Sequence, residues 1–208
     1  MFSVIAIGYE MLSSLIPFLI MLVLFRRVRG KYSASVSRWN YILPAVFAVY
    51  IIAVFHITGV GTLYDGLTAE LEEMKERINL IPFSNKIDVI GYLLNIVMFV
   101  PLGFFIPLIW NQMGKLSNAI LVGATFSILI ELSQLLSYRG TDIDDLITNT
   151  LGAAIGYLIY KMWDRLSSSK YQFAGIDSWE LPAYILVLFL GRFLFFNYVG
   201  LIDLVYGF

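Results

Sequence analysis

The chain has 208 residues, of which 59% are hydrophobic, 16% are aromatic and only 14% are charged. Its mean hydropathy of +0.80 exceeds what one soluble core can bury, so the composition excludes a soluble domain and predicts an all-α, polytopic transmembrane helical bundle. The absence of cysteine excludes disulfides, thiolate metal sites and cysteine nucleophiles, and a net charge of −1 gives no reason to expect a nucleic-acid partner.

Six apolar segments of membrane-crossing length follow one another along the chain. We expect spans near residues 3–25, 41–63, 89–110, 117–137, 145–162 and 181–203. The third contains Pro101 and Pro107, which predict a kink or a break in that helix. No basic residues precede the first span, which predicts a retained helix rather than a cleaved signal peptide.

A short amphipathic helix is expected in the loop between the second and third spans. The apolar residues that recur there at helical spacing, with charges between them, are Leu67, Leu71, Met74 and Ile78. Asp65 or Thr68 can cap this helix. We expect it to lie on the outer membrane face and to cover the bundle.

Lysine and arginine predict the orientation of the bundle. Nine of the 14 basic residues fall in three loops that share one side of a six-span protein: Arg26, Arg27, Arg29, Lys31, Arg38, Lys115, Lys161, Arg165 and Lys170. The positive-inside rule makes that side the cytoplasm. The chain is then a multi-pass protein of the cell membrane with both termini, and the polar turn at residues 139–145, on the extracytoplasmic side.

Polar side chains gather at one end of three consecutive spans and in the turn between two of them. Each unpaired polar side chain would cost roughly several kcal/mol in lipid. We therefore expect the polar faces of the third, fourth and fifth spans to face one another. Gly152 and Gly156 would let the fifth span approach a neighbour closely. The candidate ligand-binding residues are Asn95, Glu131, Gln134, Arg139, Asp142, Asp145 and Asn149.

Two interpretations of this cluster stay open. Its charged residues can bind a ligand, or they can form a salt-bridge and hydrogen-bond network that fixes the turn between the fourth and fifth spans. For the amides of Asn95, Gln134 and Asn149, hydrogen bonds between helices are the favoured interpretation.

Three further polar residues lie inside apolar spans. His56, the only histidine, is expected to make a buried polar contact rather than to relay protons, although its depth would allow it to join the cluster. Glu10 and Arg192 lie in the first and sixth spans, where we expect them to pair across the bundle as a structural lock.

Five short blocks carry a family resemblance. They are INLIPF at 78–83, NIVMFVPLG at 95–103, ELSQ at 131–134, RGTDIDD at 139–145 and NTLG at 149–152. In this order they resemble the VanZ-like family of bacterial membrane proteins, and the order makes the signal stronger than any single block. The predicted organisation is an N-terminal span with a basic loop over 1–40, a VanZ-like core of four spans over 41–163, and a linker with a C-terminal span over 164–208.

The resemblance implies a bacterial cell-envelope protein associated with resistance to the lipoglycopeptide teicoplanin, without alteration of the D-Ala-D-Ala terminus. In the favoured hypothesis, the extracytoplasmic cluster binds a lipid-linked envelope precursor or a lipoglycopeptide among the membrane lipids. Arg139 would contact a phosphate or carboxylate, and the amides would contact sugar or peptide groups. This hypothesis needs no metal and no cofactor.

An alternative hypothesis is a membrane-embedded hydrolase or transferase that acts on a lipid-linked substrate. Its catalytic candidates are Glu131, Asp142, Asp144 and Asp145, and the three aspartates could hold a divalent cation. Against it, no histidine or cysteine accompanies the cluster. A transporter is the third hypothesis, to which only the Pro101–Pro107 segment points.

Overall fold

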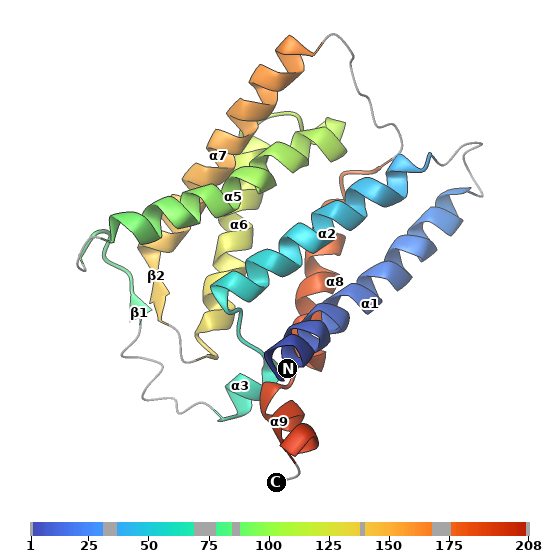
Figure 1. The fold of residues 1–208 in the computed structure, drawn as a ribbon. Helices are drawn as coiled ribbons and strands as arrows, with labels where there is room; N and C mark the ends of the chain where they lie inside the picture. Colours follow the sequence, from blue (N-terminus) through green and yellow to red (C-terminus); the bar gives the residue numbers. More distant parts are fainter. Residues whose placement is uncertain are drawn as a thin grey trace.

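The computed structural model is a bundle of helices and describes residues 2–30, 37–68, 78–84, 88–137, 140–167 and 176–206 (Figure 1). Its elements are α1 (Phe2–Gly30), α2 (Trp39–Thr58), α3 (Leu63–Thr68), β1 (Ile78–Asn79), α5 (Val89–Ile109), η1 (Asn111–Met113), α6 (Leu116–Gln134), β2 (Thr141–Asp142), α7 (Ile143–Leu166), α8 (Glu180–Phe195) and α9 (Tyr198–Tyr206). The predicted all-α class is confirmed.

Among the described helices, α1, α2, α5 and α6 are long and apolar enough to cross a membrane. Helices α8 and α9 together make a fifth candidate, bent by 45° at the break between them. The expected six continuous spans are therefore corrected in two places. The segment 181–203 is a bent pair, and the segment 145–162 coincides with α7, whose polar residues lower its hydropathy below that of the candidate spans.

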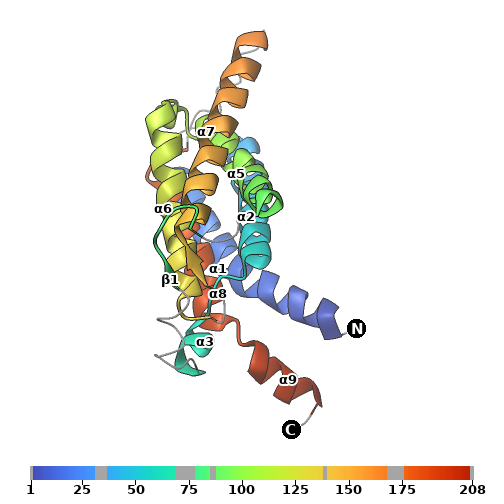
Figure 2. The ribbon, with the colours of Figure 1, turned by 90° about the vertical axis from the view of Figure 1, so that its left-hand side faces the viewer.

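The helices pack in two groups. One contains α5, α6 and α7, the other contains α1, α2 and α8, and α2 contacts α5 between them (Figures 1 and 2). Aromatic rings fill the junction: Phe47 of α2 lies 5.2 Å from Trp110, centroid to centroid, and Phe55 lies 5.7 Å from Phe126 of α6. These rings are almost fully buried, which places the common core at this junction.

Close backbone contact joins α5 to α7, as the small residues of α7 predicted. A Cβ atom at Gly152 would overlap the carbonyl oxygen of Ile96, and one at Gly156 would overlap that of Val100. The prolines of α5 do not break it, because the helix continues from Val89 to Ile109 through Pro101 and Pro107. Of the two outcomes expected for this span, a kink or a break, the break is therefore absent.

Residues 78–79 form a strand, not the end of the expected amphipathic helix. β1 pairs with β2 in parallel, with Ile78 opposite Thr141 and Asn79 opposite Asp142. Most of that predicted helix, residues 69–77, lies outside the described residues. The described part of the loop contains α3, where Thr62 accepts a bond from the Asp65 amide and donates its own amide to the Asp65 carboxylate. This reciprocal pairing caps α3.

Two buried ion pairs tie α8 to α1. Arg192 donates through Nε to Glu10 Oε1 at 2.8 Å, which confirms the predicted lock. At the other end of the α1–α8 helix pair, Arg26 makes a bidentate contact with the Glu180 carboxylate and donates to the Tyr184 hydroxyl at 2.7 Å. Arg26 is 1% exposed, so it belongs to the core rather than to a basic loop.

His56 completes the first lock. Its Nδ1 atom lies 2.7 Å from Glu10 Oε2, but its side chain is 51% exposed on the protein surface. The expectation of a buried contact is therefore wrong, because α1 covers only part of the α2 face that carries His56. His56 belongs to the α1–α8 lock rather than to the polar cluster.

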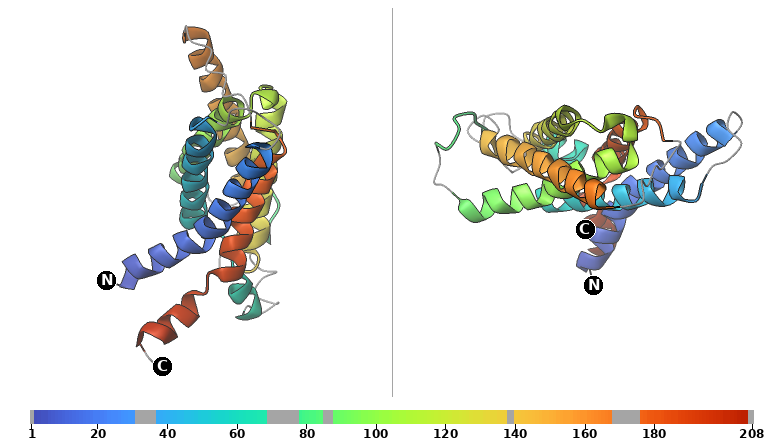
Figure 3. Two further views of the ribbon diagram at one scale, coloured as in Figure 1. Left: turned by 90° about the vertical axis from the view of Figure 1, so that its right-hand side faces the viewer. Right: turned by 90° about the horizontal axis from the view of Figure 1, so that it is seen from above.

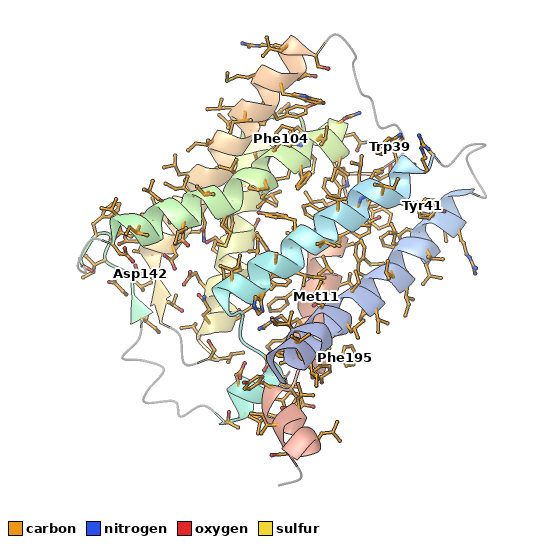
Figure 4. All side chains as sticks on the ribbon, in the orientation of Figure 1. Met11, Trp39, Tyr41, Phe104, Asp142 and Phe195 are labelled. Atoms are coloured by element: carbon orange, nitrogen blue, oxygen red, sulfur yellow. The ribbon has the colours of Figure 1, made fainter. Side chains whose placement is uncertain are left out.

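All four tryptophans belong to helix ends that lie at one end of the bundle. Trp39 begins α2, Trp110 follows α5, Trp163 is in the last turn of α7, and Trp179 precedes α8. Figure 4 labels Trp39 at this end, whereas α9 and the N-terminal half of α1 project together from the opposite end (Figure 3). Tryptophan favours the headgroup region of a bilayer, so the three exposed ones, Trp39, Trp163 and Trp179, mark this end as one membrane surface.

Candidate functional site

The candidate site lies at the end of the bundle opposite the tryptophans. There α5 and α7 begin, α6 ends, and β1 pairs with β2 (Figure 1). Asp142 lies at this edge, between β2 and α7 (Figure 4). Three helix ends and a strand pair therefore bring residues from four separate sequence blocks together.

Asp142 connects three of these elements. Its carboxylate caps α7 by accepting the Asp144 amide at 3.0 Å, and it accepts Asn79 Nδ2 at 3.2 Å to each oxygen. Its own amide donates to Glu131 Oε2 at 3.0 Å. Asp142 thus joins β1, the start of α7 and the end of α6.

Asp144 holds the turn that follows β1. It is 1% exposed, and its two oxygens accept the Phe83 amide at 2.8 Å and the Tyr92 hydroxyl at 2.5 Å. The carboxylate lies in the first turn of α7, where the helix dipole favours a negative charge. A buried anion with two donors and a favourable dipole is a structural anchor.

The turn held by Asp144 has an unusual backbone. Ser84 donates its amide to the Ile81 carbonyl at 3.3 Å, Pro82 occupies the second position, and Phe83 has φ of 55°. This arrangement is a type II turn, whose third position favours glycine. Here a phenylalanine occupies it, with its ring 6.1 Å from the Tyr92 ring.

The polar stripes of α5, α6 and α7 face one another, as their helical spacing predicted. Asn95 Nδ2 donates to Asp145 Oδ1 at 2.7 Å, and Asn149 Nδ2 donates to Ser127 Oγ at 3.0 Å. Glu131, 6% exposed, also accepts from Thr141 through its backbone carbonyl at 3.0 Å. The contacts run from the surface at Asp145 inward to Ser127.

Gln134 departs from the expected cluster. Its Nε2 atom donates to the carbonyl of Thr58 at 2.8 Å, so it joins α6 to the end of α2 rather than to α5 or α7. Its Oε1 atom, like Oδ1 of Asn149, is buried without a hydrogen-bond partner in the described structure. Asp88, on the polar stripe of α5, is the N-cap of that helix and accepts the Gly91 amide at 3.0 Å.

Arg139 lies outside the described residues, so its proposed contact with a ligand stays a prediction. No group of three or more acidic or histidine side chains in the described part of the chain is arranged to hold a metal ion. The physical reason is that Asp142, Asp144 and Asp145 turn toward different partners, namely β1, the Phe83 turn and α5. The metal-dependent enzyme hypothesis gains no support from this geometry.

Sequence reasoning missed the role of Asn79. Its side chain binds Asp142 and accepts from the Ile81 amide at 3.2 Å and the Ser84 hydroxyl at 2.9 Å. The signal was present, because Asn79 belongs to the first resemblance block and stands three residues before a proline. Without the strand pairing, however, nothing local indicated that this block meets the aspartates.

The family model described as VanZ/LLP1 matches residues 47–164, which contain every block of the site. The chain belongs to the VanZ/LLP1 family. It is 29% identical over 94 residues to the protein named Protein VanZ of Enterococcus faecium. That similarity covers 45% of this chain and 58% of the relative, so it spans little more than half the length of VanZ. No solved structure matches this chain.

Membership of the VanZ/LLP1 family and the apolar helices together make this chain a membrane protein. The matched range runs from α2 to α7 and includes the whole candidate site. Helices α1, α8 and α9 lie outside it. The two ion pairs between α1 and α8 therefore join helices that lie outside the family match.

Proposed function

We propose that this protein contributes to teicoplanin-type glycopeptide resistance in a bacterial cell envelope by binding an amphiphile at the α5–α6–α7 cluster. The amphiphile is a lipid-linked envelope precursor or the lipoglycopeptide itself. Family membership supports the link to resistance, and the local surface supports the binding.

The observation that carries the proposal is an exposed apolar turn beside the polar cluster. Leu80 and Ile81 are each 68% exposed and Phe83 is 54% exposed. The same turn is bound to Asp142 and Asp144 through Asn79 and the Phe83 amide. A polar and an apolar surface therefore adjoin each other, as the two parts of an amphiphile require.

The apolar surface continues along α5. Ile90 and Leu94 are exposed on this helix, and Leu94 is next to Asn95, the partner of Asp145. A lipid tail can lie on this face while hydroxyl or amide N–H groups of the headgroup donate to the half-buried carboxylates. Arg139, two residues before Thr141 in the chain, would bind a phosphate or carboxylate with its planar fork.

Drug susceptibility of a teicoplanin-sensitive Gram-positive host tests the proposal. Expression of the full chain should raise the inhibitory concentration of teicoplanin, and Ile81→Ser should reduce the increase because the exposed apolar turn loses contact with the acyl tail. Leu204→Ser, at an exposed site on α9, is the matched control and should retain full protection. Melting temperatures of the purified variants should stay within a few degrees of the wild type.

Arg139→Lys tests the polar half of the site, with Arg165→Lys at the far end of α7 as its control. The Arg139 variant should lose protection and keep its melting temperature, because lysine keeps the charge but not the bidentate geometry. If the Ile81→Ser and Arg139→Lys variants both protected the host as well as the wild type does, the proposed binding site would be wrong. An absence of protection by the wild type would overturn the function.

A further inference from the structure

A groove of about 790 Å³ runs between α6 and α8. Its walls are apolar and come from Leu121, Val122 and Leu129 on α6 and from Leu181, Ile185 and Leu186 on α8. Helix α6 is a candidate membrane span and α8 is part of one. A groove between two such helices opens to acyl chains rather than to water, so its natural occupant is lipid.

One end of the groove is polar. Gln112, Asn118 and Ser178 line it there, and the Ser178 amide donates to Gln112 Oε1 at 3.3 Å across the gap between η1 and the start of α8. Trp179, 55% exposed, lies at the same end. An exposed tryptophan beside polar groups marks the headgroup level of the bilayer, so the groove has one apolar and one interfacial end.

The length of the groove suits one acyl chain. From Asn118 to Leu129 the α6 wall rises about 16 Å at the α-helical rise per residue. The hydrocarbon core of a bilayer is about 30 Å thick, so one leaflet occupies about half of it. A chain that starts at the headgroup level therefore reaches the end of the groove near the middle of the bilayer.

The charge at the polar end of the groove indicates which kind of lipid headgroup binds there. Lys115 is exposed one turn before Asn118, and no described side chain caps the first turn of α6. The positive end of the α6 helix dipole adds to the lysine charge. We propose that this groove binds one phospholipid, with an acyl chain between α6 and α8 and an anionic headgroup at Lys115 and Asn118.

This site is separate from the polar cluster. Its headgroup end lies at the start of α6, whereas Glu131 lies at the end of the same helix. Helix α8 is also outside the range that the family match covers, so the groove depends on a helix beyond the family core. The proposal therefore does not rest on the proposed function.

Native mass spectrometry of the full chain in detergent tests the proposal, with dioleoylphosphatidylglycerol and dioleoylphosphatidylcholine as probes. The wild type should retain one phosphatidylglycerol per chain and at least tenfold less phosphatidylcholine. Thr125→Trp should remove the retained lipid because the indole fills the groove. Ile128→Trp, on the same helix but outside the groove, should retain it.

The Thr125 hydroxyl bonds only to backbone carbonyls of its own helix in the described structure, so its loss strands no partner on α8. If Thr125→Trp does not fold, Leu186→Trp on the opposite wall provides the same test. Lys115→Gln should abolish the preference for phosphatidylglycerol, whereas Lys161→Gln on α7 should not.

Equal retention of the two lipids by the wild type would overturn the anionic headgroup. Lipid retained by Thr125→Trp as fully as by Ile128→Trp would overturn the groove as the site. A wild-type dimer that carries no lipid and that Thr125→Trp converts to a monomer would show that a second copy of the chain fills the groove instead.

Discussion

The side-chain amide of Asn95 donates a hydrogen bond to the carboxylate of Asp145 across 2.7 Å, and this bond joins α5 to the first turn of α7. Both residues are half-buried, so the bond is partly shielded from solvent. The two residues lie 50 positions apart in the sequence. Their bond connects the starts of α5 and α7, which lie at the candidate site.

Asn95→Ala should lower the free energy of unfolding by roughly 1–3 kcal/mol, because a partly buried carboxylate loses its donor. Asn111→Ala, at an exposed position in η1, should change it little. Thermal melting of the purified variants in detergent measures both. A double-mutant cycle with Asp145→Ala should give a coupling above about 0.5 kcal/mol; simple additivity would contradict the contact.

Gly152→Ala should be strongly destabilising, because the added Cβ overlaps the Ile96 carbonyl where α5 and α7 touch. We expect a loss of roughly 1–3 kcal/mol, the usual result of forcing a packed interface apart. Gly8→Ala is the control, since nothing lies within 4 Å of the position that its Cβ atom would take, and alanine there should stabilise α1 slightly. Similar melting temperatures for the two variants would refute this close approach.

Arg192→Leu should destabilise the protein by roughly 3–5 kcal/mol, since it leaves the buried Glu10 carboxylate with only the half-exposed His56 imidazole as its partner. The double variant Glu10→Leu with Arg192→Leu should recover much of the loss, because the stranded charge is gone. Arg165→Leu, exposed at the end of α7, serves as the control. The lock would be disproved by a double variant that melts no higher than the single one.

Phe83→Gly should be more stable than Phe83→Ala by about 1 kcal/mol. Both variants lose the ring, but only glycine adopts the left-handed backbone of this turn without steric cost, which is about 1–2 kcal/mol for other residues. At Leu94, exposed in the second turn of α5, the order should reverse because glycine is the poorer helix former. Melting curves of the four variants measure both differences, and the same order at both positions would contradict the turn.

The orientation of the bundle is tested by single cysteines in this cysteine-free chain. Ser137→Cys should react with a membrane-impermeant maleimide in intact cells, whereas Ser167→Cys should react only after permeabilisation. The reason is that the basic loops belong to the tryptophan end of the bundle and favour the cytoplasm. The reverse labelling pattern would place the candidate site inside the cell.

Helical spacing predicted which faces of α5, α6 and α7 meet at the site, because residues four and seven positions apart lie on one side of any helix. It could not predict which neighbour each side chain would choose. Gln134 shares a face with Glu131, yet it binds the carbonyl of Thr58 because α2 ends beside that turn of α6. Asn79 and Asp144 were separated from their partners by long stretches of chain, and no local pattern joined them.

The sequence by itself determined the membrane class, the positions of α1, α2, α5 and α6, and the family, because hydropathy, periodicity and short blocks depend on neighbouring residues. Only the tertiary structure decided that Asn79 would meet Asp142 across 63 positions and that Arg26 would be buried against Glu180 across 154. Such contacts depend on how distant segments pack into one core. A polar group buried there without a partner costs roughly several kcal/mol, so each group pairs with a partner that the packing places within hydrogen-bond distance.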